Sequence, residues 1–502
     1  MTDIGMEVRT TSGTVRGRAA EGLAVFLGIP FAQPPVGVLR FAAPQPALPW
    51  DGVRDAAEFE PPPPQSGPLG AAGAAAGTEW LTVNVWSPDP GAARLPVLVW
   101  IHGGAYISGF SGDPMYHAAL IARQGLVVVT FNYRVGVEGF AQLRDAPANR
   151  GLLDQLAVLH WVRQNIARFG GDPERITLVG QSAGAGSIAT LLTMPLAAGL
   201  FQRAIAQSVP GLYCTPALAA DIAATLAERL GAAPTAAGLA ATDPQRLADE
   251  ADLLSRGLPA YAHRWGRVTQ VGVPFSPVVD GEVVSDVPWR ALTDGRSAGV
   301  DLLTGHTRDE CRLFQALGGR IGKTTEQDAA TALRILAPGT AGTDGEQAYR
   351  SSYPHTSAEG LPELVHSDAI FRMPTLHLAE AHIAAGGTAF LYELRWPSPA
   401  LGGALGACHA LDVPLLFGTF SSPGARMLLG DEEPSAEALT LADEIRRAWT
   451  AFAAHGDPGW PTYGADQRLT RLLDADSSTA PYPERLSQRI WNGHDLDPFD
   501  LL

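Results

Sequence analysis

Apolar residues in this 502-residue chain follow two different spacing patterns. Between residues 8 and 32 they begin by alternating with polar ones, which is typical of strands with one solvent-facing side. We therefore expect an N-terminal antiparallel hairpin region over residues 8–41, which includes a Pro-rich loop at 33–37. From residue 80 onward, short apolar runs alternate with helical segments, and this second pattern predicts the main body of the fold.

The second pattern predicts strands that are joined by helices. The expected strands are nearly continuous in apolar residues and cover 81–86, 96–101, 127–132, 176–179, 300–304 and 389–394. Residues 275–281 read as a further strand and turn, and residues 151–169 have apolar positions at helical spacing. Such a pattern is typical of an α/β fold, in which helices cover both faces of a mostly parallel sheet.

Three further segments complete the expected layout. Residues 60–77 are rich in Pro, Gly and Ala, and we expect a weakly ordered loop there. Residues 212–272 are Ala-rich and helical, so we expect them to cover the carboxyl edge of the sheet. Residues 439–454 have the pattern of an amphipathic C-terminal helix, which the segment 455–458 ends. We expect a single domain over 1–502.

The charge balance narrows the classes of partner. The chain has 36 Lys and Arg against 52 Asp and Glu, which gives a net charge of −16. This charge argues against nucleic acid and anionic membrane surfaces as partners. We expect a cytoplasmic protein without a membrane span, because the N-terminus lacks a signal-peptide pattern and no apolar run reaches about 18 residues. The three cysteines lie far apart, so we expect neither a disulfide framework nor a metal site.

One stretch carries a recognisable nucleophile pattern. Residues 175–187 read as a short apolar strand, a tight turn at Ser182 and the start of a helix. Residues 180–184 fit Gly-x-Ser-x-Gly, in which small residues on both sides let the backbone bend sharply at the serine. Residues 295–299 fit the same pattern around Ser297, but they lack the strand before and the helix after. The structural context therefore favours Ser182.

Two polar loops supply the other groups that serine chemistry needs. Asp309 and Glu310 lie just beyond strand 300–304, where a carboxylate can fix the tautomer of a histidine. His409 follows strand 389–394, so nucleophile, acid and base stand in the chain order of α/β-hydrolases. The chain has 12 histidines, and His455 also lies late, but it follows a helix and is the weaker candidate.

A third loop follows strand 96–101 and consists of small residues, His102-Gly-Gly-Ala105. Small residues let backbone N–H groups approach a ligand closely. An oxyanion hole needs such donors about 3 Å from the forming alkoxide. A simple turn would use the same glycines, so this loop by itself leaves both interpretations open.

Together these stretches resemble the type-B carboxylesterases of the α/β-hydrolase fold. The pattern is close to that of bacterial p-nitrobenzyl-esterase-like enzymes and more distant from that of cholinesterases. The matching stretches run nearly end to end and cover residues 28–41, 81–86, 102–105, 132–136, 151–155, 169–173, 180–184, 200–208, 309–310 and 409–414. The resemblance implies a central, mostly parallel sheet with helices on both faces, a small N-terminal antiparallel sheet, and helical insertions over the carboxyl edge.

The resemblance also implies roles for single residues, and it implies no cofactor and no metal. The implied catalytic triad is made of a nucleophile, an acid and a base, which are Ser182, Glu310 and His409. The implied oxyanion hole is made of three backbone N–H groups, which belong to Gly104, Ala105 and Ala183. Ser208 matches a serine that supports the triad, although an ordinary buried hydroxyl explains it equally well.

Three departures from the family pattern bear on function. Glu79 and Trp80 stand where relatives often have Asp-Cys, so the corresponding disulfide is absent, which fits a reducing compartment. Gln181 replaces a glutamate that often precedes the nucleophile. One negative charge near the imidazolium is thereby lost, which argues against a preference for cationic substrates. Cys311 stands where glycine is common and reads as a small buried residue.

We therefore expect a serine carboxylesterase that hydrolyses short-to-medium acyl or aromatic esters through an acyl-enzyme. Its partner would be a small-molecule ester, and we expect a monomer, with a homodimer as the alternative. Five residues near the motifs are candidates for an apolar pocket, although core packing explains them equally well: Tyr106, Phe110, Phe275, Leu313 and Phe314. Two other functions stay open, a binding protein of the same fold without activity, and an amidase or carbamate hydrolase that uses the same triad.

Overall fold

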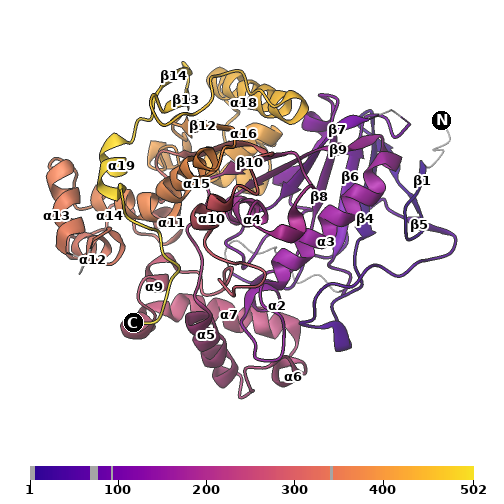
Figure 1. Cartoon of the computed structure of the whole chain (residues 1–502), viewed down its shortest axis with the longest axis horizontal. Coiled ribbons are helices and arrows are strands. Elements are labelled where there is room, and N and C mark those ends of the chain that lie inside the picture. The colour runs from indigo at the N-terminus through magenta and orange to yellow at the C-terminus, as the bar shows by residue number, and fades with distance from the viewer. Residues whose placement is uncertain (1–5, 68–76, 92–93, 340–342) are drawn as a thin grey trace.

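A computed structural model describes residues 6–67, 77–91, 94–339 and 343–502. It has a large twisted sheet with helices on both faces and a separate group of helices at one end (Figure 1). The α/β class expected from the sequence is confirmed. Of the loop expected to be weakly ordered, residues 68–76 lie outside the described residues.

Within the described residues, eleven strands form the large sheet in the order β14-β13-β12-β11-β10-β9-β7-β8-β6-β4-β3. Their bounds are β3 (Arg18–Ala20), β4 (Leu23–Pro30), β6 (Thr82–Ser87), β7 (Leu95–Ile101), β8 (Val127–Phe131), β9 (Gly171–Gln181), β10 (Arg203–Gln207), β11 (Asp301–Thr307), β12 (Ala389–Leu394), β13 (Leu469–Leu473) and β14 (Ser478–Pro481). The central strands, from β8 through β7 and β9 to β13, pair in parallel, and antiparallel strands flank them.

Alternate residues of the central strands face two different cores. In β7, Val97 and Val99 pack into the core that holds α3 (Arg150–Asn165), α4 (Ala183–Leu191) and α15 (Met373–Ala384). Leu98 and Trp100 pack into the other core, with α1 (Ala119–Ala122), α16 (Asp412–Phe417) and α18 (Ala436–His455). Because both faces are covered, these strands read as continuous apolar runs.

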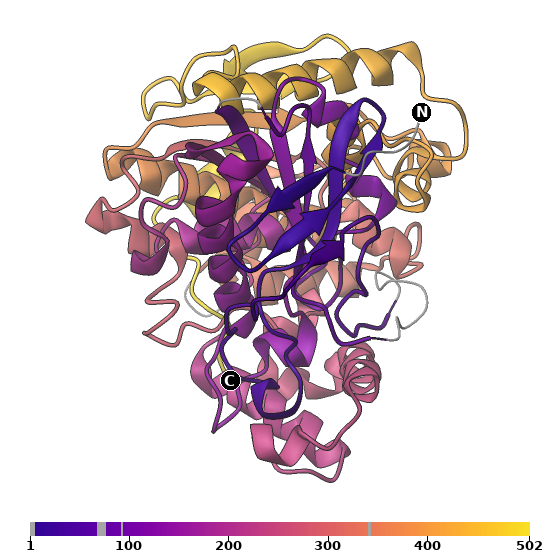
Figure 2. The ribbon, with the colours of Figure 1, turned by 90° about the vertical axis from the view of Figure 1, so that its right-hand side faces the viewer.

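The N-terminal region contributes to both sheets. β1 (Glu7–Arg9) and β2 (Thr14–Arg16) form the expected antiparallel hairpin. β5 (Val53–Asp55) pairs with β2 in parallel, so this small sheet is mixed and not purely antiparallel. β3 and β4 pair antiparallel at one end of the large sheet. Figure 2 shows the small sheet lying in front of the large one, with α18 across the top.

The strand expected at 275–281 is wrong. Only a single bridge, between Cys214 and Val278, pairs this segment with a neighbour among the described residues. The side chain of Asn149 forms hydrogen bonds with both backbone groups of Val278. It donates to the carbonyl and accepts from the N–H, each at 2.8 Å. Pro277 has no N–H to donate, so the segment cannot extend the pairing.

A helical cover and the long helix α18 add to the sheet. The cover contains α5 (Pro216–Arg229), α6 (Ala236–Leu239), α7 (Pro244–Gly257), α8 (Ala262–Trp265) and α9 (Val268–Val271), which gather below the sheet in Figure 1. α18 begins three residues before the expected start, because Ser435 caps it by accepting from the N–H of Ala438. No helix in the described part of the chain is long and apolar enough to cross a membrane.

Candidate active site

Ser182 lies in the turn between β9 and α4. Its backbone has φ 58° and ψ −125°, a conformation that costs energy for a residue with a side chain. Small neighbours permit the turn, since a Cβ on Gly184 would stand 2.0 Å from the carbonyl oxygen of Ile101. The turn holds the serine at the end of the strand, where its side chain faces a cavity.

Glu310 and His409 face each other from the loops that follow β11 and β12. Nδ1 of His409 lies 2.5 Å from Oε2 of Glu310, and the N–H of Thr307 donates to Oε1 at 2.8 Å. Burial raises the pKa of Glu310, but the charge and hydrogen bond of His409, together with Ser208 and Thr307, lower it more. The net pKa lies below its ordinary value, so the carboxylate stays ionised and keeps a proton on Nδ1.

The neighbouring Asp309 makes different contacts, with Ala407 and Arg308. Its Oδ2 accepts from the N–H of Ala407 at 2.9 Å and pairs with Arg308 at 3.1 Å. These contacts hold the loop that leads to His409 against the loop that carries Glu310. Of the two acids that the sequence left open, Glu310 is the one in contact with the histidine.

The other ring nitrogen of His409 contacts Gln181. Nε2 lies 3.1 Å from the side-chain nitrogen of Gln181, which is 5% exposed at the end of β9. The residues that the structure describes form no hydrogen bond between Ser182 and His409. Catalytic hydrogen bonds often reach good geometry only in the complex with substrate, so this spacing is compatible with proton transfer.

Ser208 lies fully buried near Glu310. Its hydroxyl forms no hydrogen bond of good geometry within the described ranges, yet it stands close enough to Glu310 to help lower the pKa of that carboxylate. With φ 57°, Ser208 has a backbone conformation that is uncommon for a residue with a side chain. A group that supports the acid and an ordinary buried hydroxyl both remain open as interpretations of Ser208.

The loop after β7 presents its backbone toward Ser182. Three successive residues have positive φ: Gly104 at 112°, Ala105 at 55° and Tyr106 at 61°. Within the described chain, the N–H groups of Gly104, Ala105 and Ala183 donate to no backbone acceptor. Ala183 is the first residue of α4, and the N-terminus of a helix favours negative charge. These three donors are therefore available to an oxyanion.

A cavity of about 1050 Å³ opens at this site. Its lining includes Ser182 and His409, and also three of the five expected pocket residues, Phe110, Leu313 and Phe314. Tyr106 and Phe275 are not part of this lining and belong to the core. The ring of Tyr106 packs against Phe140 with centroids 5.0 Å apart, and Phe275 is 2% exposed. Their proximity in sequence to the motifs does not translate into proximity to the cavity.

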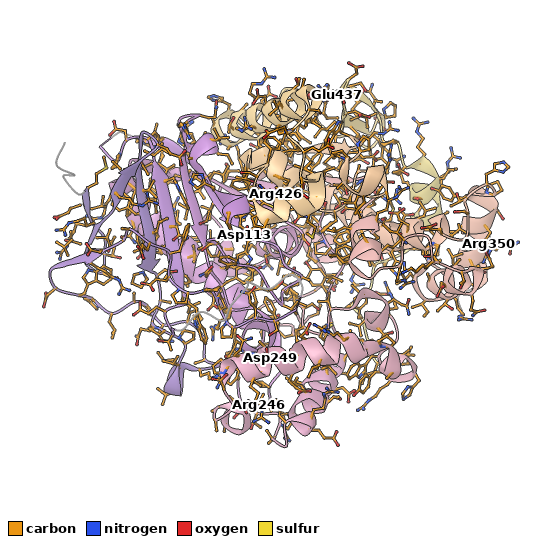
Figure 3. All side chains as sticks on the ribbon, turned by 180° about the vertical axis from the view of Figure 1, so that it is seen from behind. Asp113, Arg246, Asp249, Arg350, Arg426 and Glu437 are labelled. Carbon is orange, nitrogen blue, oxygen red and sulfur yellow. The ribbon has the colours of Figure 1, made fainter. Side chains whose placement is uncertain are left out.

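Part of the lining comes from segments that carried no signal in the sequence. One wall consists of the short helix η2 (Pro114–Tyr116) and of α17 (Pro423–Leu429), which contribute Met115, Met427 and Leu428. Figure 3 shows Asp113, before η2, near Arg426 of α17, and the two helices are in contact. Another wall includes Phe371 from the π-helix η7 (Asp368–Arg372). Chain neighbourhood could not reveal Phe371, Met427 and Leu428, because they lie outside the motifs in sequence.

The second Gly-x-Ser-x-Gly motif is placed quite differently. The Ser297 hydroxyl lies 3.1 Å from Nδ1 of His382, and Nε2 of that histidine lies 2.9 Å from the carbonyl oxygen of Val300. Both side chains are buried, and neither lines the cavity. A backbone carbonyl takes the place that a carboxylate has in a triad.

The three cysteines form no disulfide in the part of the chain that the structure describes. Cys214, Cys311 and Cys408 are free and buried, and burial raises the pKa of each thiol. Within the described ranges, no three His, Cys, Asp or Glu side chains come together in a group that could hold a metal ion.

Comparisons with known proteins identify the family and the fold. A model of the carboxylesterase family matches residues 5–484. The chain is 34% identical to the para-nitrobenzyl esterase of Bacillus subtilis (strain 168), over 95% of this chain and 96% of that protein. It is 33% identical to the phenmedipham hydrolase of Pseudarthrobacter oxydans, over 91% and 92%. The solved structure of the Geobacillus stearothermophilus carboxylesterase EST55 matches with a TM-score of 0.85 and 33% identity, over 97% of this chain and 99% of that one.

Proposed function

We propose that this chain, which belongs to the carboxylesterase family and is a carboxylic ester hydrolase of the α/β-hydrolase fold, works through a triad of Ser182, Glu310 and His409. The observation that carries the proposal is the contact of 2.5 Å between His409 Nδ1 and Glu310 Oε2, beside the strained turn of Ser182. A carboxylate, an imidazole and a serine in this order are the parts that nucleophilic acyl transfer needs.

In the first half of the reaction, Nε2 of His409 takes the proton of Ser182 as Oγ bonds to the ester carbonyl carbon. The carbonyl oxygen becomes an oxyanion that accepts hydrogen bonds from the N–H groups of Gly104, Ala105 and Ala183. When the C–O bond to the alcohol breaks, His409 returns the proton to the departing oxygen. The acyl group stays on Ser182 as an ester.

The second half repeats these steps with water. His409 takes a proton from the water molecule while its oxygen bonds to the acyl carbon, and the same three N–H groups hold the new oxyanion. Collapse releases the carboxylic acid and gives the proton back to Ser182. Glu310 stabilises the imidazolium in both halves and stays ionised throughout, as its lowered pKa favours.

The proposed substrates are short-to-medium acyl or aromatic esters. The cavity of about 1050 Å³ is large enough for a drug-sized molecule, and aromatic and aliphatic side chains line it near the serine. The name of the Bacillus subtilis relative, a para-nitrobenzyl esterase, supports an aromatic ester as a first substrate to try. We further propose that the protein acts as a monomer in the cytoplasm, which analytical ultracentrifugation and cell fractionation would check.

Alanine variants of the two motif serines test the proposal. Ser182→Ala should lower turnover of p-nitrophenyl butyrate by about 10⁴-fold or more. Ser297→Ala is the matched control, since it removes a serine in the same sequence motif, and it should retain wild-type turnover. A sulfonyl fluoride should add its mass to the peptide that contains Ser182. Substantial turnover by Ser182→Ala would refute Ser182 as the nucleophile, whereas the absence of an adduct would favour a binding protein of the same fold.

A further inference from the structure

Two phenylalanine rings lie beside the imidazole of His409. The ring centroid of Phe371 lies 4.3 Å from that of His409, with 34° between the planes, and Phe314 lies at 5.3 Å and 41°. Phe371 is the buried one, at 3% exposed against 37% for Phe314. A ring face within about 6 Å attracts a cation, so Phe371 can both limit the tilt of the imidazole and stabilise its protonated form.

Phe371 lies in a π-helical turn. The turn η7 (Asp368–Arg372) joins α14 (Gly360–Ser367) to α15 (Met373–Ala384). Short π-helical turns are rare and often occur at functional sites. An α-helix advances about 100° per residue, so a loss of one residue here would turn Phe371 away from His409. The position of the ring therefore depends on the helix keeping this irregular turn.

A buried ion pair holds the two ends of the π-helical turn. Arg372 lies 3.0 Å from Asp368, which begins the same turn, and 3.1 Å from Glu484. Arg372 is 2% exposed and Asp368 is fully buried. Charges that are taken out of water require such partners, so the pairing favours one arrangement of the turn over others.

The helix α19 (Arg485–Trp491) and Tyr349 contribute the rest of this network. Ser487 donates to Oδ2 of Asp368 at 2.5 Å, and Tyr349 donates to the same oxygen at 2.8 Å. Trp491 donates from Nε1 to the hydroxyl of Tyr349 at 2.7 Å. The three side chains are buried. α19 lies beyond residue 484, where the match to the family model ends.

We propose that Phe371 is a positioning residue for His409, and that α19, through Ser487 and Trp491, holds the π-helical turn that places it there. The inference rests on the proposed role of His409 as the catalytic base. It assigns a function to α19, which contributes no residue to the cavity lining. The effect reaches the reaction through the orientation of the imidazole and through the stability of its charged form.

Variants of Phe371 separate positioning from pocket lining. Phe371→Leu keeps an apolar side chain but loses the ring face, so kcat for p-nitrophenyl butyrate should fall about tenfold while KM stays within about twofold. Phe371→Tyr keeps the ring face and should retain kcat within about twofold. Rates are divided by the number of sites that a sulfonyl fluoride titrates, so that unfolded protein does not count. A rise in KM with an unchanged kcat would overturn the proposal.

Variants of two tryptophans test the role of α19. Trp491→Phe removes the hydrogen bond to Tyr349, and kcat should fall about threefold at unchanged KM. Trp289→Phe is the matched control, because Trp289 also donates from Nε1 to the C-terminal segment, to the carbonyl of Leu496 at 3.1 Å, but does not touch the network. Equal effects of the two variants would overturn the role of α19. Activity of Ser182→Ala would instead refute the proposed function itself, whatever the Phe371 variants do.

Discussion

The side-chain nitrogen of Gln181 lies 3.1 Å from Nε2 of His409, the ring nitrogen that receives the proton of Ser182 in the proposed mechanism. Because Nδ1 carries a proton toward Glu310, Nε2 is an acceptor and the amide of Gln181 donates to it. The amide oxygen faces Gly103, where a Cβ would lie 3.2 Å from Oε1. An uncharged group therefore stands beside the base, in the wall of the cavity.

This contact predicts how the enzyme treats charged substrates. The wild type should hydrolyse butyrylcholine and the uncharged 3,3-dimethylbutyl butyrate with similar kcat/KM, since no carboxylate at position 181 attracts the cation. Gln181→Glu should raise the ratio of choline ester to neutral ester about tenfold, because a carboxylate in the cavity wall would attract the ammonium group. Gln181→Met, which is also uncharged, is the control and should leave the ratio unchanged. A wild type that already prefers the choline ester strongly would contradict this account.

The oxyanion loop yields a second prediction. Gly104→Ala should lower kcat about 10²–10³-fold, because φ is 112° and a Cβ would stand 2.2 Å from the carbonyl oxygen of Ser108. Moving the backbone to relieve this overlap would displace the N–H donors. Gly125→Ala is the control, since φ is 88° but nothing lies within 4 Å of the added Cβ. It should lower the unfolding temperature slightly and leave kcat unchanged, and an equal loss of kcat in both variants would argue against the assigned donors.

The cavity yields a third prediction, on chain length and bond type. Among p-nitrophenyl esters of straight-chain acids, kcat/KM should peak at about four to eight carbons, because the cavity is bounded on several sides. A profile that rises steadily to long-chain emulsified lipids would refute the proposed substrate class. Matched ester, carbamate and amide substrates with one acyl group and one leaving group should show the ester fastest. A faster amide or carbamate would shift the function to the alternative hydrolase.

The order of chemistry along the chain was readable, because parallel strands end at the same edge of a sheet. Ser182, Glu310 and His409 each follow an apolar run, and the fold brings these loops together at one cavity. The strands with continuous apolar residues were predicted for the same reason. β10 (Arg203–Gln207) was not predicted although it lies in the middle of the sheet, because the strand is only five residues long and partly polar.

The parts that the sequence did not reveal depend on contacts between distant segments. Phe371 approaches His409 because of a π-helical turn, and no local sequence pattern predicts that turn. Tyr106 follows the oxyanion loop directly, yet its ring lies in the core against Phe140. Apolar side chains near a motif can face either way, and only packing decides between the cavity and the core.

A buried glutamate near Glu310 yields the last prediction, on stability. Glu363 is 8% exposed, and its Oε1 accepts from the hydroxyl of Ser367 at 2.6 Å. Burial raises the pKa of Glu363 from 4.5 to about 7, against the lowering effects of Arg372 and Ser367. The folded protein therefore keeps this carboxyl protonated in a range where the unfolded chain ionises it.

The sign of the effect follows from that difference. Between about pH 4.5 and 7 the unfolded state binds fewer protons at this site than the folded state, so Glu363 lowers the free energy of unfolding as the pH rises. Glu363→Gln cannot ionise and keeps an acceptor for Ser367. Its free energy of unfolding, relative to the wild type, should rise by up to about 3 kcal/mol from pH 4.5 to pH 8.

Urea unfolding at several pH values measures this difference. The lowered pKa of Glu310 acts in the opposite direction, but it is common to both proteins and cancels in the comparison. Glu432→Gln, at an exposed position, is the control and should show no pH-dependent gain. If the Glu363→Gln difference stays flat across this range, Glu363 is ionised in the folded protein and the burial argument for it is wrong.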